Sequence, residues 1–236
     1  MEREQFYQTL IGQVPKGELS VAQRRQGFAK LMSKFPGASD IRMEPIEIGK
    51  LTAAWISAPH CSRDKVILFF HGGADSAGSF DSHQDLIGRM ARATGCTVLA
   101  VNYRLAPEHP FPAAIEDAQA AYYFLLMEKI LPRNIFLAGT SAGGGLILAL
   151  LLKLKHDQEP LPRAAICICP WVDLALTGKT LKTNEGKDLI HNRFDVSGFN
   201  QFCNLTQLVS LCLHEKKRIL DPKFLRLFPD TGAYQR

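Results

Sequence analysis

The sequence has no long apolar segment and no apolar leader at its start. Its longest uninterrupted apolar run, residues 146–152, is far shorter than the roughly 20 residues that a membrane-spanning helix needs. The first five residues are mostly polar and do not form the apolar core of a secretion signal. We therefore expect a protein of the cytoplasm with no membrane span.

The sequence also has no block of like charge. The formal net charge is +5, and the lysines and arginines are scattered, with one short run at Lys216-Lys217-Arg218. A run of that size is usual at a solvated helix end, whereas nucleic-acid-binding proteins gather many basic residues on one surface. We therefore expect neither a nucleic-acid partner nor a membrane-surface patch.

Cysteine pairs of the kind that bind zinc are absent. The chain has six cysteines, none in a CxxC arrangement. Cys167 and Cys169 are two residues apart in a strand-like run and so face the same way, but no other ligand residues cluster near them. Without a secretion signal the compartment is expected to be reducing, so we expect free thiols and no metal site.

The residues that are present alternate between strand and helix patterns. The length of 236 residues, with 46% hydrophobic side chains, fits one large domain. Apolar strands and helices follow one another from residue 66 to residue 169, which predicts an open, mostly parallel sheet with helices on both faces. The strands are predicted at 66–70, 97–103, 134–138 and 164–169, and the helices at 82–92, 112–129 and from the Ser141 turn to 155.

The flanking segments have different patterns. Residues 2–35 show two helical periodicities, and residues 41–48 and 51–57 predict a hairpin that turns at Gly49-Lys50. Ser82 and Asp85 predict a capping box for the helix that Gly95 ends. Residues 171–236 are polar and mixed, with one helical stretch at 196–213 and no buried strand.

A glycine-flanked serine follows the predicted strand at 134–138. The sequence Gly139-Thr140-Ser141-Ala142-Gly143 is typical of a tight strand-to-helix turn that presents a nucleophilic serine, here Ser141. Neighbouring backbone crowds such a turn, so only small residues fit at Gly139 and Gly143. The N–H of Ala142, at the positive end of the following helix, is expected to be one donor of an oxyanion hole.

A second glycine motif, His71-Gly72-Gly73, ends the strand at 66–70. Glycine lets the backbone approach a ligand closely, so Gly72 and Gly73 are expected to supply further oxyanion donors. Taken alone, Ser141 would also fit a simple helix N-cap in a loop. The nucleophile is favoured because its motif lies between an apolar strand and a helix, downstream of a second strand that ends in His-Gly-Gly.

These motifs make the chain resemble the hormone-sensitive-lipase-like (GDXG-type) esterase family of α/β-hydrolases, over roughly residues 20–200. The segments that carry the resemblance are Phe69-Phe70-His71-Gly72-Gly73, residues 103–114 with Glu116-Asp117, Gly139-Thr140-Ser141-Ala142-Gly143-Gly144, and residues 169–174. It implies an α/β-hydrolase fold, hydrolysis of short-chain carboxylic esters through an acyl-serine intermediate, and no cofactor. It makes His71 a shaper of the oxyanion loop.

The resemblance also implies a division of the chain. Residues 1–38 would form an N-terminal cap segment, residues 39–175 the core, and residues 176–236 the cap insertion with the C-terminal part. Two residues depart from the family pattern: Ala74 stands in place of a third glycine and Thr140 in place of an aspartate. Ala74 is still small, and the β-branch of Thr140 is stiff, so we expect altered but not abolished packing at the turn.

The acid and the base of a catalytic triad remain open. In α/β-hydrolases they follow the serine in the order acid, then histidine. No strand is predicted after residue 169, so we expect a C-terminally shortened form without the last two strands, in which residues 164–169 form an edge that would pair with a second copy. His191 and His214 are weak candidates for the base, and His60 and His83 are assigned solvated positions. The alternative function is a non-catalytic ligand binder or an inactive fragment.

Overall fold

The computed structural model describes residues 20–174 and 178–184 of the chain. They form a six-stranded sheet with the strand order β1-β2-β4-β3-β5-β6. The strands are β1 (Arg42–Ile48), β2 (Leu51–Ser57), β3 (Ser62–Phe70), β4 (Cys96–Val101), β5 (Ile135–Thr140) and β6 (Ala164–Ile168). The helices are α2 (Val21–Met32), α3 (Gln84–Thr94), α4 (Ala113–Met127), α5 (Ala142–His156) and α6 (Thr180–Thr183), with 3-10 turns η1 (Asp81–His83) and η2 (Pro132–Asn134).

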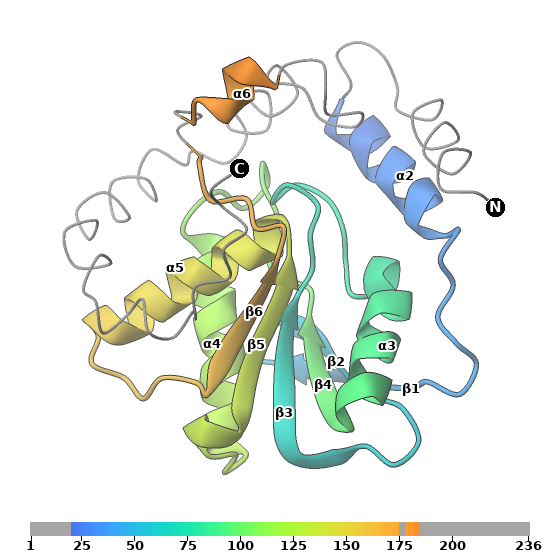
Figure 1. Ribbon diagram of the computed structural model, residues 1–236, viewed down its shortest axis with the longest axis vertical. Coiled ribbons are helices and arrows are strands. Elements are labelled where there is room, and N and C mark those ends of the chain that lie inside the picture. Colours follow the sequence, from blue (N-terminus) through green and yellow to red (C-terminus); the bar gives the residue numbers. More distant parts are fainter. Residues whose placement is uncertain (1–19, 175–177, 185–236) are drawn as a thin grey trace.

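Strands β3, β4, β5 and β6 are parallel, and the β1–β2 hairpin joins them in antiparallel pairing with β4. The hairpin turns at Gly49, where Ile48 pairs with Leu51. Helices α4 and α5 cover one face of the sheet, and α3 covers the other (Figure 1). The expected mostly parallel sheet with helices on both faces is therefore confirmed.

Strand β3 lies at the centre of the sheet, and its residues 66–70 are buried on both faces. Val66, Leu68 and Phe70 pack toward α4 and α5, while Ile67 and Phe69 pack toward α3. All five side chains are at most 2% exposed. This double burial explains why the strand is apolar at every one of these positions, without the alternation of a half-exposed strand.

The start of α3 differs from the prediction. The helix begins after η1 with His83 as its N-cap residue, and no side chain caps it. The hydroxyl of Ser82 instead lies within hydrogen-bond distance of the carbonyl of Ser79 and of Nδ1 of His83. The predicted capping box is wrong because the short polar side chain bonds within its own turn. Gly95 ends the helix in the left-handed region, with φ 66°, as expected.

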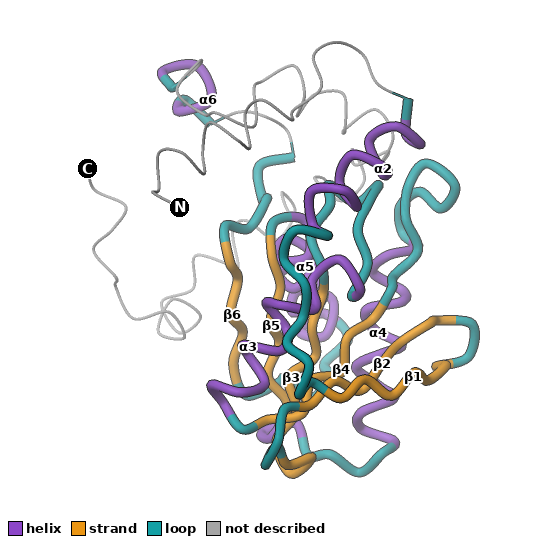
Figure 2. Tube along the Cα trace, turned by 90° about the vertical axis from the view of Figure 1, so that its right-hand side faces the viewer, coloured by secondary structure: helices purple, strands orange, loops and turns teal. Residues whose placement is uncertain are grey.

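Helix α2 lies beyond the carboxyl ends of the parallel strands in two perpendicular views (Figure 1, Figure 2). It confirms the second of the two predicted N-terminal helices, and Ser20 and Gln23 form a capping box at its start. The first predicted helix and the helical stretch at 196–213 lie outside the described residues. Among the helices that are described, none has the length and apolar character to cross a membrane.

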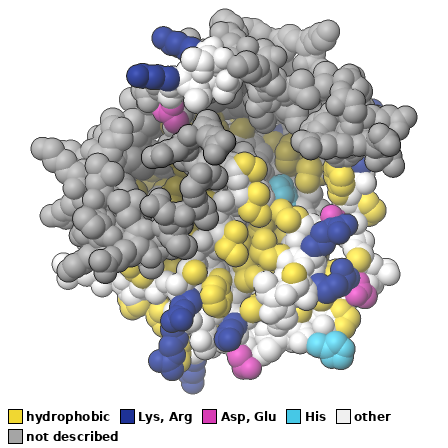
Figure 3. Space-filling view, in the orientation of Figure 1, with side chains coloured by type: hydrophobic (Ala, Val, Ile, Leu, Met, Phe, Trp, Pro, Cys, Tyr) yellow, Lys and Arg dark blue, Asp and Glu magenta, His cyan; other side chains and the backbone are white. Residues whose placement is uncertain are grey.

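Within the described part of the chain, β6 pairs with β5 alone and forms one edge of the sheet. Ile166 on this strand is 48% exposed. Figure 3 shows apolar side chains gathered at the centre of the face on which β6 lies. An apolar edge strand of this kind offers unpaired backbone groups to another chain.

Candidate active site

Ser141 occupies the sharp turn between β5 and α5. Its backbone has φ 51° and ψ −118°, a region that residues with a side chain rarely adopt and that typically costs about 1–3 kcal/mol. The Ser141 N–H donates to the carbonyl of Ile168 over 2.9 Å, and the Ser141 carbonyl accepts from the N–H groups of Gly145 (3.1 Å) and Trp171 (3.0 Å). The turn is thus held by the end of β6 and by the segment that follows it.

The two glycines that flank the turn lie against neighbouring backbone. A Cβ atom on Gly143 would lie 2.2 Å from the carbonyl oxygen of Phe70 and 2.5 Å from that of His71. One on Gly139 would lie 2.8 Å from the Phe70 oxygen. Real Cβ atoms do not approach so closely, so any larger residue would push β3 and the turn apart. The structure thus has the crowding at Gly139 and Gly143 that the sequence motif predicts.

The loop after β3 contacts the same turn. A Cβ atom on Gly72 would lie 2.9 Å from Oγ1 of Thr140 and 3.3 Å from Cβ of Ser141. The loop then bends tightly, with φ 131° at Gly73 and φ 53° at Ala74. The structure therefore brings the two predicted glycine motifs together, although they are about 70 residues apart in the sequence.

The N–H groups of this loop are not used as expected. The N–H of Gly72 donates to Nε2 of His83 over 3.3 Å, within the protein. The N–H groups of Gly73 and Ala74 have no acceptor among the described residues. Ala142 is the first residue of α5, where a backbone N–H has no partner within the helix. Donors for an oxyanion are thus available at Gly73, Ala74 and Ala142, while that of Gly72 is occupied.

His71 is buried beneath the loop. Its ring stacks on Tyr103 with centroids 4.3 Å apart, and its Nδ1 lies 2.8 Å from the carbonyl of Gly72, which can only accept. The hydroxyl of Tyr103 donates to the His71 carbonyl over 2.8 Å. Burial lowers the pKa of His71 to about 3, so the ring is neutral. These contacts fit a residue that shapes the loop.

His83 does not have the solvated position that the sequence suggested. It is 6% exposed, and both ring nitrogens have partners: Nε2 faces Gly72 and Thr140, and Nδ1 faces Ser79 and Ser82. Burial lowers the pKa of the ring. The solvated assignment is wrong because η1 folds His83 back under the loop, and no sequence pattern marks that turn.

Comparison with known proteins decides the family. Residues 67–208 match the family model described as the alpha/beta hydrolase fold. The chain therefore belongs to the α/β-hydrolases that this model describes. An acetyl-hydrolase of Streptomyces hygroscopicus is 38% identical over 176 residues, which are 75% of this chain and 58% of that protein. An esterase of Acinetobacter venetianus is 36% identical over 68% of this chain and 53% of that protein.

Solved structures agree with this family assignment. A crystal structure of an esterase from the bacterial hormone-sensitive lipase family has a TM-score of 0.79 at 37% identity, covering 85% of this chain and 69% of that one. A hormone-sensitive lipase from a metagenome library has a TM-score of 0.79 at 32% identity. The chain spans about half the length of the curated relatives it matches. Within the α/β-hydrolases, the chain belongs to the hormone-sensitive-lipase-like esterase family. The expected family and fold class are confirmed.

Arg25 links α2 to this α/β-hydrolase core, and sequence reasoning missed it. Its Nε donates to the carbonyl of Ser76 over 2.7 Å, and its guanidinium contacts both carboxylate oxygens of Glu108 at 2.8 and 2.7 Å. The same guanidinium donates to the carbonyl of Ala106. One half-buried arginine thus fastens α2 to the loop after β3 and to the long signature segment. No local signal distinguishes it from other arginines on a surface helix.

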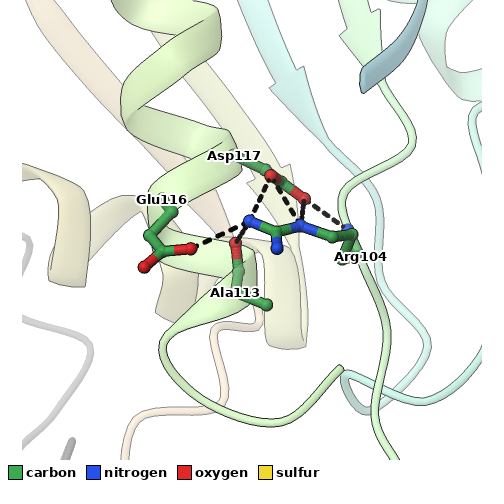
Figure 4. Close-up of polar contacts among 4 residues, drawn as sticks. All are labelled: Arg104, Ala113, Glu116 and Asp117. Carbon is green, nitrogen blue, oxygen red and sulfur yellow. Dashed lines mark hydrogen bonds and ion pairs between the residues drawn. The ribbon is translucent and has the colours of Figure 1, made fainter. Parts of the chain in front are cut away.

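The family signature at residues 103–117 contains a second arginine network (Figure 4). Asp117 accepts the backbone N–H of Arg104 at 2.7 Å and its Nε at 2.9 and 3.0 Å. The guanidinium of Arg104 also contacts Glu116 at 2.9 Å and the carbonyl of Ala113 at 3.3 Å. These bonds hold the segment between β4 and α4 against the start of α4. The signature therefore stabilises the fold of this segment.

Asp75 follows the two available loop donors and has φ 55°. Its carbonyl accepts the N–H of Ala106 over 2.9 Å, while its carboxyl group has no partner among the described residues. Burial raises the pKa of that carboxyl to about 6. An unpaired acid directly beside Ala74 was not singled out from the sequence, because a single aspartate in a loop is usually solvated.

The remaining histidines are exposed or lie outside the described ranges. His191 and His214, the weak candidates for the base, fall outside residues 20–174 and 178–184. His60, His109 and His156 are exposed. The four described cysteines are free thiols, and the described part of the chain contains no group of three side chains that could hold a metal ion.

Proposed function

We propose that this chain hydrolyses carboxylic esters through an acyl-serine intermediate on Ser141. The contact between Gly72 and the Ser141 turn carries the proposal, since it brings a glycine-rich loop within van der Waals distance of a strained serine at a helix N-terminus. A serine ester hydrolase needs this combination, because the nucleophile and the oxyanion donors must both be about 3 Å from one carbonyl group.

In the proposed reaction, Oγ of Ser141 adds to the ester carbonyl carbon and gives up its proton to a base. The N–H groups of Ala142, Gly73 and Ala74 would hold the oxyanion, with Ala74 in the place we first expected for Gly72. The alcohol leaves with a proton, and water then releases the acid from the serine. Each oxyanion donor typically supplies about 3 kcal/mol of transition-state stabilisation. The triad acid and base stay unassigned, with His191 and His214 as the weak candidates.

For the substrate we propose an ester with a short acyl chain. The names of two relatives, an acetyl-hydrolase and an esterase, support this class. The short side chain of Ala74 beside the proposed hole is compatible with it. A series of p-nitrophenyl esters from acetate to octanoate tests the proposal, and kcat/KM should be highest for acetate or butyrate. A maximum at octanoate would contradict the short-chain class.

Two serine variants test the reaction itself. Ser141→Ala should abolish ester hydrolysis without changing the circular dichroism spectrum. Ser39→Ala is a matched control, because Ser39 is exposed between α2 and β1, away from the turn. It should keep the wild-type rate. Hydrolysis that survives Ser141→Ala would overturn the assignment of the nucleophile.

A non-catalytic ligand binder is the second candidate. It is supported by His71 and His83, the buried histidines of the described residues. Their partnered ring nitrogens contact Gly72 and Ser79, so these nitrogens hold the loop in place and are not free to act as a base. A binder would show no turnover of any ester in the series, yet would be stabilised against heat by a non-hydrolysable ketone analogue of the ester. Turnover that depends on Ser141 would exclude it.

The proposal further includes a helical cap from residues 1–38 and 176–236 and self-association through β6. The β6 edge and the 48% exposure of Ile166 support pairing with a second copy. Sedimentation analysis of wild type and Ile166→Lys tests this, because a charge on an edge strand disfavours pairing. A dimer that is unchanged in Ile166→Lys, or a monomeric wild type, would contradict it.

A further inference from the structure

His83 is enclosed beneath the loop that follows β3. Its ring centroid lies 6.0 Å from those of Phe28 in α2 and Phe69 in β3, and 5.9 Å from that of His71. Buried polar nitrogens are stable only when they are hydrogen-bonded, so the partners of this ring are part of the fold. They also decide how the loop meets the Ser141 turn.

The partners of His83 determine which ring nitrogen carries the hydrogen. Nδ1 lies 3.1 Å from the carbonyl oxygen of Ser79, which can only accept, so Nδ1 must donate. Nε2 is then without a hydrogen and accepts the N–H of Gly72, which can only donate, over 3.3 Å. Both sides of the ring therefore select the same neutral tautomer.

The same nitrogen reaches the residue before the proposed nucleophile. Oγ1 of Thr140 lies 3.4 Å from Nε2 of His83, and it is also the atom that a Cβ on Gly72 would approach to 2.9 Å. One ring nitrogen thus faces both the loop after β3 and the end of β5. The three residues form a clamp, His83-Gly72-Thr140, that holds the loop against the turn.

We infer that His83 is a positioning residue for the proposed ester hydrolysis. Its Nε2 directs the Gly72 N–H into the protein, and the bend at Gly73 and Ala74 then leaves their N–H groups without acceptors among the described residues. The hydroxyl of Thr140 makes a second, longer contact with the same nitrogen, at 3.4 Å. This inference rests on the proposed function, because it concerns the donors that would hold the oxyanion.

Two substitutions of His83 distinguish the role of Nε2 as a hydrogen-bond acceptor from the role of the side chain in filling space. The amide oxygen of glutamine reaches the position of Nε2 and can accept the Gly72 N–H, whereas asparagine reaches only the position of Nδ1. His83→Asn should lower kcat by about 10- to 100-fold, below the loss for a deleted oxyanion donor, with KM changed by less than about threefold. His83→Gln should stay within about fivefold of wild type. His156→Gln, at the exposed end of α5, is the control for histidine replacement and should be unchanged.

Thr140 gives a second pair of variants in case His83→Asn does not fold. Thr140→Val keeps the shape and removes the hydroxyl, and kcat should fall by about three- to tenfold. Thr140→Ser keeps the hydroxyl and should remain close to wild type. Equal kcat values in His83→Asn and His83→Gln, or in Thr140→Val and Thr140→Ser, would overturn the inference. So would an effect confined to KM.

A measurement on the wild-type protein keeps this inference apart from the proposed function. Nitrogen NMR of the histidine rings at neutral pH should show His83 with a protonated Nδ1 and an unprotonated, hydrogen-bonded Nε2. A protonated Nε2 would overturn the inference whether or not the chain hydrolyses esters. An inactive wild type with the expected tautomer would overturn the proposed function, and with it the role of the clamp in catalysis.

Discussion

Tyr103 and His71 are joined twice. Their rings stack with an interplanar angle of 13°, and the Tyr103 hydroxyl donates to the His71 carbonyl over 2.8 Å. Tyr103 begins the long family signature, while His71 begins the glycine loop. Two motifs that are separate in the sequence are therefore one structural unit under the Ser141 turn.

Removing the Tyr103 hydroxyl tests this unit. Tyr103→Phe keeps the stacked ring and leaves the buried His71 carbonyl without this donor, so the free energy of unfolding should fall by about 1–2 kcal/mol. Urea denaturation measures it. Tyr123→Phe is the control, because its hydroxyl contacts Glu159 and Gln119 near the surface, and it should cost less. An equal or larger loss in the control would contradict the account.

The steric role of Gly143 gives a second prediction. In Gly143→Ala the new Cβ would lie 2.2 Å from the Phe70 carbonyl oxygen, so β3 and α5 must separate. We expect a loss of about 3 kcal/mol or more in unfolding free energy, together with loss of ester hydrolysis. Gly27→Ala in α2 has nothing within 4 Å of the new Cβ and should stabilise the protein by about 0.5–1 kcal/mol. Thermal and urea unfolding measure the change in unfolding free energy in both variants. Equal changes in Gly143→Ala and Gly27→Ala would contradict the steric role of Gly143.

The Arg104 network gives a third prediction (Figure 4). Asp117→Ala removes a nearly buried carboxylate that accepts the backbone N–H and the side chain of Arg104, and it should lower the unfolding free energy by about 1–3 kcal/mol. Glu116→Ala removes an exposed partner of the same arginine and should cost no more than about 0.5 kcal/mol. Similar losses from both variants would mean that Asp117 is not the anchor of this segment.

The unpaired carboxyl of Asp75 gives a dependence on pH. Its pKa in the folded protein is about 6, above the ordinary 3.8, so the folded state binds more protons between these values. The contribution of Asp75 to the free energy of unfolding therefore falls as the pH rises from about 4 to about 6. Asp75→Asn removes the charge. Its free energy of unfolding should exceed that of wild type by between about 1 and 3 kcal/mol near pH 7 and should equal it near pH 4.

His71 makes the free energy of unfolding depend on pH in the opposite direction. Wild type alone would therefore show the two effects mixed, and the comparison with Asp75→Asn separates them. Its pKa in the folded protein is about 3, below the ordinary 6.5, so the unfolded state binds more protons between these values. Stability from this group is present above pH 6.5 and falls as the pH is lowered. Because wild type and Asp75→Asn share His71, its contribution cancels in their difference. A difference that grows toward acid pH would contradict the assignment to Asp75.

The sequence predicted those parts of the fold that depend on neighbouring residues. The apolar run of β3, the Gly95 helix end and the glycines around Ser141 each follow from local sterics or from burial on both faces of a strand. These constraints act within a few residues, so they leave a pattern that can be interpreted without the structure.

The rest of the site depends on partners that are far apart in the chain. Arg25 meets Glu108 across 83 residues, and His83 meets Thr140 across 57. The Gly72 N–H could be assigned to the oxyanion only while the position of His83 was unknown. Ser82 bonded within its own turn instead of capping α3. Hydrogen-bonding side chains can choose among several partners, and the tertiary fold makes that choice.

We propose that Ser141 is an activated nucleophile beside an oxyanion hole. Fluorophosphonates react with such serines and remain attached, so intact-protein mass spectrometry followed by peptide mapping tests the claim directly. We expect one adduct per wild-type chain, located on Ser141, and none in Ser141→Ala. A folded wild type that takes up no fluorophosphonate, or an adduct on another residue that persists in Ser141→Ala, would contradict it.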